Sequence, residues 1–132
     1  MKERSLLVIK PDAVKKKKIG KIIEILEENG FEIKDIKMKR LKKEEAEKFY
    51  MPHKGKDFFN KLIDFITSGE VVGILVEKEN AIEKLRELVG ETDPKKARCG
   101  TIRHMFGENI TENAVHAADS LESFKREISI FF

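Results

Sequence analysis

The sequence predicts an α+β fold in which one mostly antiparallel, four-stranded sheet is covered by helices. The chain has 132 residues, the size of a single domain and too short for two cores. Apolar residues make up 40% of the chain, enough for one core beneath a surface in which charged residues are frequent. The apolar spacing changes repeatedly between the period of strands and that of helices, without a repeat or a linker. We therefore expect residues 1–132 to form one domain.

A proline and a glycine mark the ends of the first strand and the first long helix. Ser5–Ile9 is a short apolar run that predicts a buried strand, and Pro11 ends it with a turn. Four consecutive lysines, Lys15–Lys18, are expected in the loop that follows. From Ile19 to Asn29 the apolar residues share one helical face, and Gly30 then takes the left-handed conformation that ends many helices.

A second strand and two helices are predicted next. Phe31–Leu41 alternates apolar and polar residues, but the phase slips between Ile33 and Ile36, which predicts a bulge or a twist. Helical spacing predicts a short helix around Ala46–Tyr50 and a second one over Phe58–Ile66.

The remaining elements complete the predicted sheet. Val71–Val76 is continuously apolar, as expected of a central strand covered on both faces. Asn80 is expected to cap the next helix, and the polar stretch Glu91–Thr111 is expected to be a long functional loop. Asn113–Ala117 predicts a short strand, and Asp119 is expected to cap the last helix. This order of elements is typical of ferredoxin-like sandwiches.

Composition narrows the classes of function. No apolar run approaches 18 residues and the N-terminus has no signal-peptide pattern, so we expect a cytoplasmic protein without membrane contact. The single cysteine, Cys99, fits a reducing compartment. The net charge of +3 favours anionic ligands only mildly. We interpret Lys15–Lys18 as a solvated loop, and a nucleic-acid-binding patch is the alternative.

Three features could carry chemistry. They are the turn at Lys10–Asp12, the segment that contains Arg86, Thr92 and Arg103, and His116. Each also has an ordinary explanation, such as a strand-end lysine, an exposed helical arginine or a hydrogen-bonded histidine. The sequence contains no G-x-x-x-x-G-K-[ST] loop, no dinucleotide fingerprint and no Cys/His cluster with metal-ligand spacing. A phosphate group would therefore have to be bound by side chains.

Glu127 does not fit a surface position. It lies three residues after Phe124 and four before Phe131, so it shares a helical face with two core aromatic residues. A carboxylate that points inward is unfavourable unless it has a partner. His116 precedes the same helix, and a carboxylate that holds one ring nitrogen supports charge on an imidazole that attacks an electrophile. His116 is therefore a candidate nucleophile.

Several segments in a fixed order along the chain lead to a known family. They are Val8–Val14, Phe49-Tyr50, Phe58-Phe59, Thr67–Gly69, Glu79–Ala81, Gly90–Pro94, Gly100–Arg103, Asn113–His116 and Asp119–Ser123. Each segment is weak alone, but their order and spacing cover nearly the whole chain. Because of these segments, taken together, the sequence resembles the nucleoside diphosphate kinases.

The resemblance implies catalytic and phosphate-binding roles. His116 matches the histidine that accepts a phosphoryl group and passes it on in a ping-pong cycle. Glu127 matches the acid that holds the far ring nitrogen, and Tyr50 matches a tyrosine beside the histidine. Four further residues match contacts to the nucleotide phosphates, where charge neutralisation drives phosphoryl transfer: Lys10, Arg86, Thr92 and Arg103.

The resemblance also implies how the rest of the nucleotide is bound. Phe58 and Ile110 match the positions that sandwich the base, and Asn113 with Lys10 matches the sugar contacts. Stacking tolerates many bases, so broad substrate use is expected. Mg²⁺ is expected to be held mainly by the phosphates and water, without metal ligands from the protein. Family members usually assemble as homo-oligomers, either hexamers or tetramers.

One departure from the family pattern bears on the rate. The family usually has serine two residues after the nucleophile, and this chain has Ala118. Loss of one hydrogen bond of about 0.5–1.5 kcal/mol predicts a slower enzyme rather than an inactive one. Two alternatives remain open at this point: a non-catalytic nucleotide-binding protein and, less favoured, a nucleic-acid-binding module.

Overall fold

The strands form one antiparallel sheet in the computed structural model, which describes residues 2–132. The sheet order is β2-β3-β1-β4, and each neighbouring pair is antiparallel. The strands are β1 (Lys2–Ile9), β2 (Glu32–Lys39), β3 (Val71–Glu79) and β4 (Val115–Ala117). The predicted α+β fold with a mostly antiparallel four-stranded sheet is confirmed.

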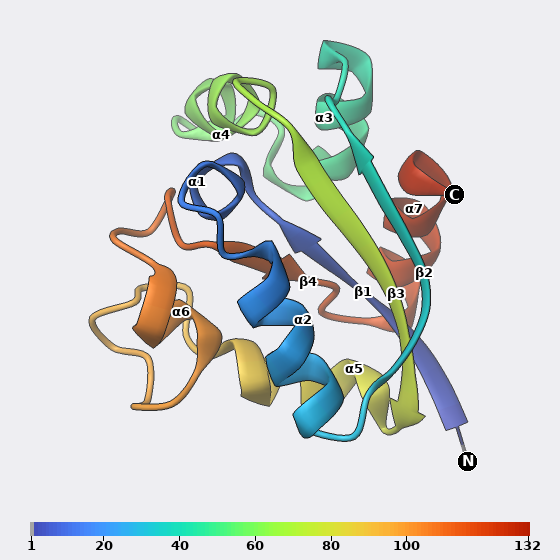
Figure 1. The fold of residues 1–132 in the computed structure, drawn as a ribbon. Helices are drawn as coiled ribbons and strands as arrows, with labels where there is room; N and C mark the ends of the chain where they lie inside the picture. The colour runs from blue at the N-terminus through green and yellow to red at the C-terminus, as the bar shows by residue number, and fades with distance from the viewer. Residues whose placement is uncertain (1) are drawn as a thin grey trace.

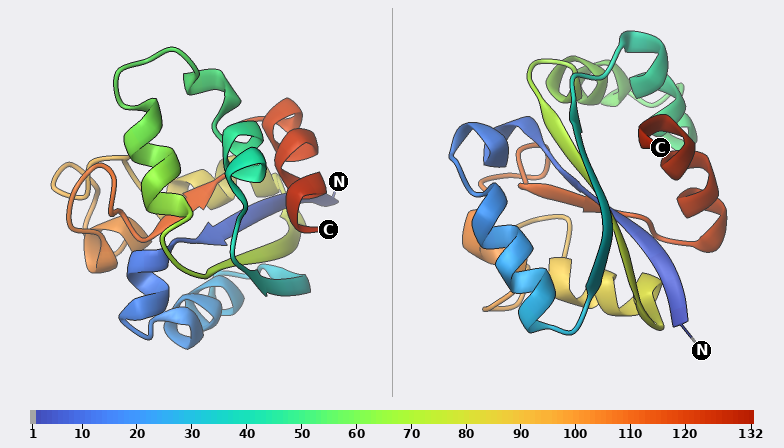
Figure 2. Two further views of the ribbon diagram at one scale, coloured as in Figure 1. Left: turned by 90° about the horizontal axis from the view of Figure 1, so that it is seen from above. Right: turned by 45° about the vertical axis from the view of Figure 1, so that its right-hand side comes forward.

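Helices cover both faces of the sheet (Figures 1 and 2). One face carries α1 (Pro11–Lys15), α2 (Ile19–Glu28), α5 (Ala81–Val89) and α6 (Ile102–Phe106). The other face carries α3 (Lys43–Phe49), the 3₁₀ turn η1 (Met51–His53), α4 (Phe59–Ile66) and α7 (Leu121–Phe131).

The alternation of side chains along β1 explains why the sheet is covered on both faces. Leu7 and Ile9 pack under α2 and α5, whereas Leu6 and Val8 pack under α3, α4 and α7. All four are 0% exposed. A strand with two apolar faces needs two helical layers, and the active site described below is built at the end of this strand.

Gly73 allows α7 to approach the middle of the sheet. A Cβ atom placed on Gly73 would lie 2.5 Å from Cδ1 of the Phe131 ring, which is far inside van der Waals contact. Phe131 is 1% exposed, so its ring fills the space that a side chain at position 73 would need. This close packing places the C-terminal helix against β1 and β3.

Two sequence-based expectations about helix caps are wrong. Asn80 precedes α5 in a left-handed conformation and makes no side-chain capping bond; instead, Oε1 of Glu3 accepts from the backbone N–H of Ile82 at 2.9 Å. The last helix is capped by Ser120, whose Oγ accepts from the N–H of Ser123 at 3.0 Å, and not by Asp119. In both cases a different acceptor serves the same exposed helix N–H groups.

The other boundaries of helices and strands can be compared directly with the sequence-based predictions. Pro11 opens the short helix α1 instead of a plain turn, as proline can at a first helical position. The expected loop at Glu91–Thr111 contains α6. Gly30 follows α2 with φ +83°, and the register of β2 shifts between Ile33 and Asp35, so both of those predictions are confirmed. Within residues 2–132, no helix is long and apolar enough to cross a membrane.

Candidate active site

His116 and Glu127 form a hydrogen-bonded pair. The Nε2 atom of His116 lies 2.9 Å from Oε1 of Glu127. The glutamate side chain is 2% exposed and that of the histidine is 22% exposed. An ionised carboxylate can only accept, so Nε2 carries the proton and donates it, which leaves the lone pair of the neutral ring on Nδ1. The nitrogen with nucleophilic character is therefore Nδ1.

Strand periodicity and helix periodicity bring this pair together. In β4 the flanking residues Val115 and Ala117 point into the core under α5, so His116 points to the opposite face of the sheet. That face is covered by α7, where Glu127 lies between the core residues Phe124 and Phe131. The inward position predicted for Glu127 is confirmed by its burial.

Two aromatic residues of α3 and its end pack beside the histidine. The ring centroids of Phe49 and His116 are 4.5 Å apart, and Tyr50 meets Phe49 edge-on at 4.9 Å. The Tyr50 hydroxyl is buried and has no hydrogen-bond partner among residues 2–132, and burial raises the pKa of Tyr50. From the sequence, Phe49 was placed in a short helix and in one of the family segments, without a role in the site. Its place beside the histidine follows from the packing of α3 on the sheet, which a single sequence does not reveal.

Lys10 is held at the end of β1 by the segment before β4. Its Nζ donates to Oδ1 of Asn113 at 2.7 Å, and the Asn113 amide group donates to the carbonyl oxygens of Thr92 at 2.9 Å and Ile110 at 3.2 Å. Both side chains are nearly buried. Burial first, and then the charge of Arg103, lowers the pKa of Lys10 to about 7. Lys10 and Asn113, both predicted to contact the sugar, are thus in direct contact.

Asp12 binds the backbone of the segment that precedes β4. Its Oδ2 accepts from the backbone N–H of Ala114 at 3.0 Å, and Ala114 has a left-handed backbone with φ +73°. Burial raises the pKa of Asp12, and its Oδ1 has no partner among the described residues. This role of Asp12 was not predicted, although the sequence analysis named the turn Lys10–Asp12 as a feature that could carry chemistry.

Arg103 joins two backbone segments next to the histidine. Its Nη1 donates to the carbonyl oxygen of Gly90 at 3.1 Å, and its Nη2 donates to that of Val115 at 3.0 Å. The residue is 6% exposed, and burial, followed by the charge of Arg86, lowers the pKa of Arg103 to about 10. The guanidinium is thereby held against the carbonyl group of Val115, the residue that precedes His116 in the sequence.

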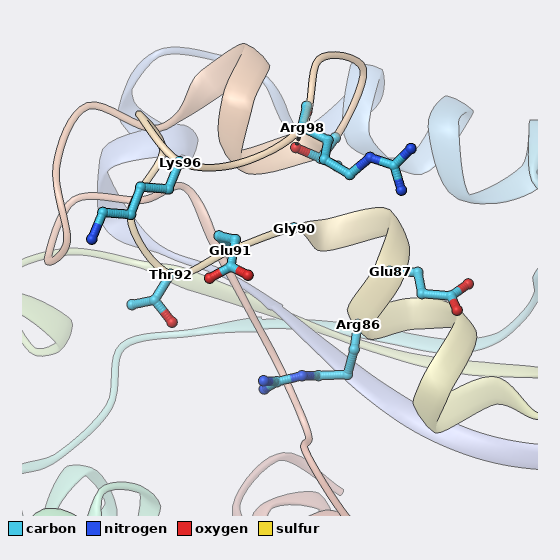
Figure 3. Close-up of a pocket in the computed structure, with 8 residues that line it drawn as sticks. Arg86, Glu87, Gly90, Glu91, Thr92, Lys96 and Arg98 are labelled. Carbon is cyan, nitrogen blue, oxygen red and sulfur yellow. Dashed lines mark hydrogen bonds between the residues drawn. The ribbon is translucent and has the colours of Figure 1, made fainter.

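A cavity of about 400 Å³ lies beside these residues, between the end of α5 and the following loop (Figure 3). Arg86 extends from α5 toward the side on which Thr92 lies, while Arg98 and Glu87 point toward the other end. The lining residues of the described chain are Arg86, Glu87, Gly90, Glu91, Thr92, Lys96, Arg98 and Thr101. The cavity therefore includes two of the four predicted phosphate contacts, Arg86 and Thr92, but not Lys10, Arg103 or His116.

The residues predicted to hold the base lie at the surface. Phe58 is 45% exposed and Ile110 is 62% exposed. The ring of His53 lies 5.3 Å from that of Phe58 and 6.2 Å from that of Tyr50, so aromatic rings form a row from the base-binding position to the histidine. Neither Phe58 nor Ile110 lines the cavity described above.

The site can therefore do three things chemically. It presents one ring nitrogen as a nucleophile, with a buried carboxylate on the other nitrogen. It brings three basic side chains, those of Lys10, Arg86 and Arg103, onto segments that adjoin the strand of His116. It offers exposed apolar surface to a planar group. These are the requirements for transferring a phosphoryl group from a phosphate ester of a planar compound to a histidine.

Comparisons with known proteins agree with this arrangement. A family model described as nucleoside diphosphate kinase matches residues 3–132. A nucleoside diphosphate kinase of Methanocaldococcus jannaschii is 52% identical over 132 residues, which is 100% of this chain and 94% of that protein. One from Nitratiruptor sp. is 55% identical over 130 residues, which is 98% of this chain and 95% of that protein.

Solved structures show the same fold. The nucleoside diphosphate kinase of Aquifex aeolicus superposes with a TM-score of 0.96 at 42% identity, covering 100% of this chain and 96% of that one. The halophilic enzyme of Halobacterium salinarum, solved in complex with CDP, superposes with a TM-score of 0.95 at 36% identity, covering 100% of this chain and 88% of that one. The ferredoxin-like arrangement predicted for the sheet and helices is that of these proteins.

Proposed function

The chain belongs to the nucleoside diphosphate kinase family, and we propose that His116 carries the phosphoryl group that passes from a nucleoside triphosphate to a nucleoside diphosphate. The observation that supports this most directly is the 2.9 Å contact between His116 Nε2 and the buried Glu127 carboxylate. We further propose that residues 1–132 act as one catalytic domain.

The reaction consists of two displacements in opposite directions. The Nδ1 lone pair of His116 forms a bond to the γ-phosphorus, while the bond from that phosphorus to the bridging oxygen breaks and its electrons leave with the nucleoside diphosphate. Glu127 stabilises the positive charge that this places on the ring. A terminal phosphate oxygen of a second nucleoside diphosphate then attacks the same phosphorus, and the N–P electrons return to the ring.

Positive side chains neutralise the transferring group. Lys10 and Arg103 are bound to Asn113 and Val115 in the segment that leads to the histidine, and Arg86 and Thr92 line the cavity nearby. Charge in a phosphoryl-transfer transition state is spread over the phosphate oxygens, so fixed cations around them lower the barrier. Tyr50 offers a buried hydroxyl that has no hydrogen-bond partner among residues 2–132.

Weaker interactions would bind the base and the sugar of the nucleotide. Phe58 and Ile110 would enclose the base. Because stacking requires only a planar ring, nucleotides with many different bases would be substrates. Asn113 would contact the sugar together with Lys10. The relative solved in complex with CDP supports nucleotide binding by this chain.

Magnesium fits this site as part of the substrate complex. Among residues 2–132 no group of three or more His, Cys, Asp or Glu side chains is placed to hold a metal ion, and the site residues are mostly donors suited to phosphate oxygens. The nucleotide phosphates and water would hold Mg²⁺, which supplies further neutralisation of their charge. We propose a cytoplasmic homo-oligomer, a hexamer or tetramer, as in other family members, without specific binding of nucleic acid.

Labelling with γ-³²P-ATP and Mg²⁺ tests the proposal. The wild-type protein is expected to carry an acid-labile, alkali-stable label that unlabelled nucleoside diphosphates remove, and His116→Ala is expected to carry none. Undiminished label on His116→Ala would exclude this residue as the carrier. Nucleotide binding by calorimetry without any label would favour a non-catalytic nucleotide-binding protein instead.

A further inference from the structure

Arg126 contacts the carboxylate that holds the histidine. Its Nη2 donates to Oε2 of Glu127 at 3.3 Å, while Oε1 of the same carboxylate faces His116 Nε2 at 2.9 Å. The Arg126 side chain is 19% exposed, so most of it is withdrawn from solvent. Each oxygen of the buried carboxylate therefore has its own nitrogen partner.

Helix geometry alone does not produce this contact. Adjacent residues of an α-helix point in different directions and do not normally face each other. Arg126 meets Glu127 because its long side chain folds back along α7. Its Nε is buried and has no hydrogen-bond partner among residues 2–132, which is unfavourable. An arginine turned toward solvent would avoid that loss, so the contact with Glu127 must offset it.

The charge of Arg126 also acts on His53, one of the row of aromatic rings. His53, on η1, has its pKa lowered by burial first, then by the charges of Lys56 and His116, and also by that of Arg126. The positive charge of Arg126 is thus felt on the side of α7 that faces the active site.

We propose that Arg126 is a positioning residue for phosphoryl transfer, which holds the second oxygen of Glu127 and so keeps the carboxylate aligned with His116. This inference rests on the proposed function of His116. A carboxylate with one partner can rotate about its last bond, whereas one with a partner on each oxygen has a single favourable orientation. In that orientation Nε2 stays bound and Nδ1 stays available.

Ala118 makes this role more important in this chain. Where the family resemblance leads us to expect a serine hydroxyl near the Glu–His pair, Ala118 offers only a buried methyl group. One hydrogen-bonding group that could hold the pair is therefore missing. Arg126 supplies a charged donor to the same carboxylate.

Single-turnover phosphorylation of His116 by ATP and Mg²⁺ tests the inference. Arg126→Gln is expected to slow phosphorylation about tenfold, equivalent to about 1.4 kcal/mol, with the Kd for ADP unchanged within twofold. Arg126→Lys keeps the charge and is expected to restore the rate to within threefold of wild type. The matched control is Lys125→Gln, which removes a positive charge from an exposed position of α7 and should leave the rate unchanged.

A double-mutant cycle separates positioning from a general effect on the helix. Because Arg126 acts through Glu127, Arg126→Gln is expected to have no further effect when Glu127→Gln is already present. An equal slowing in both backgrounds would overturn the inference. If Arg126→Gln fails to fold, Arg126→Ala, which also removes the buried unpaired Nε, provides the same comparison.

The outcomes also distinguish this inference from the proposed function. A wild-type protein that is labelled at His116, together with an Arg126→Gln variant that is labelled equally fast, refutes the role of Arg126 alone. A wild-type protein that is never labelled refutes both.

Discussion

Glu127→Gln tests the chemical centre of the site with a minimal change of shape. Glutamine fills the space of the buried glutamate, and its carbonyl oxygen can still accept from His116 Nε2. What it lacks is the negative charge. Attack by Nδ1 on phosphorus makes the imidazole ring positive, so the variant loses attraction mainly in the transition state and the phosphoenzyme, and not in the free protein.

The distance in the structure sets the size of the effect. Two unit charges 2.9 Å apart attract by about 6 kcal/mol at an effective dielectric constant of about 20. The ring charge is spread over several atoms and glutamine retains a neutral hydrogen bond, so we expect about half of this, roughly 3 kcal/mol, to be lost. A loss of that size slows phosphorylation by about 100-fold.

Rapid-quench measurement of phosphoenzyme formation gives the rate, and calorimetry with ADP gives the affinity. The expected result is a rate about 100-fold lower with little change in the Kd for ADP, because Glu127 contacts the histidine and not the nucleotide. Glu122→Gln, at an exposed position in the first turn of the same helix, is the control and should have no effect. A Glu127→Gln rate within threefold of wild type would show that the carboxylate charge does not support the histidine.

Three further predictions concern other parts of the molecule. Ala118→Ser is expected to raise the phosphorylation rate by up to about tenfold, since a typical hydrogen bond contributes about 0.5–1.5 kcal/mol; an unchanged rate in quench experiments would remove the proposed cause of slow turnover. Because burial lowers the pKa of Lys10 to about 7, the amine is mostly uncharged at pH 8 in the free protein and must gain a proton beside phosphate. Calorimetry in buffers of different ionisation enthalpy should therefore detect proton uptake on ADP binding at pH 8 that disappears below pH 6 and in Lys10→Met. Gly73→Ala is expected to lower stability by about 1–3 kcal/mol through the clash with Phe131, seen as a lower Tm, whereas Gly20→Ala, where an added Cβ meets no described atom within 4 Å, should not lower it.

Periodicity in the sequence was sufficient to place the residues that share one element or one face. The three- and four-residue spacings from Glu127 to Phe124 and Phe131 predicted burial, and the structure finds 2% exposure. The phase slip in the second strand predicted the register shift near Ile33. Such features depend on neighbours a few positions apart, so local patterns contain the information.

Features that depend on distant residues could not be found in this way. The N-terminus of α5 is satisfied by Glu3, which lies 79 positions from the N–H group of Ile82. The short helix α6 is stabilised by Arg103, whose bonds to Gly90 and Val115 cross between segments. Arg126 was not singled out because helical neighbours are not expected to touch. Each of these contacts requires the folded backbone to be known.

The site combines a buried reaction centre with an exposed apolar surface, and from this division we expect one enzyme to serve many nucleotides. Glu127, Lys10 and Arg103 are buried and hydrogen-bonded, so these side chains need little movement when substrate arrives. Phe58 and Ile110, which would meet the base, are exposed and apolar, and they discriminate weakly between planar rings. Binding would therefore depend mainly on the phosphates, which all nucleotide substrates share. A substitution in the buried group should change the rate for every nucleotide equally, whereas one at Phe58 should change affinities by an amount that depends on the base.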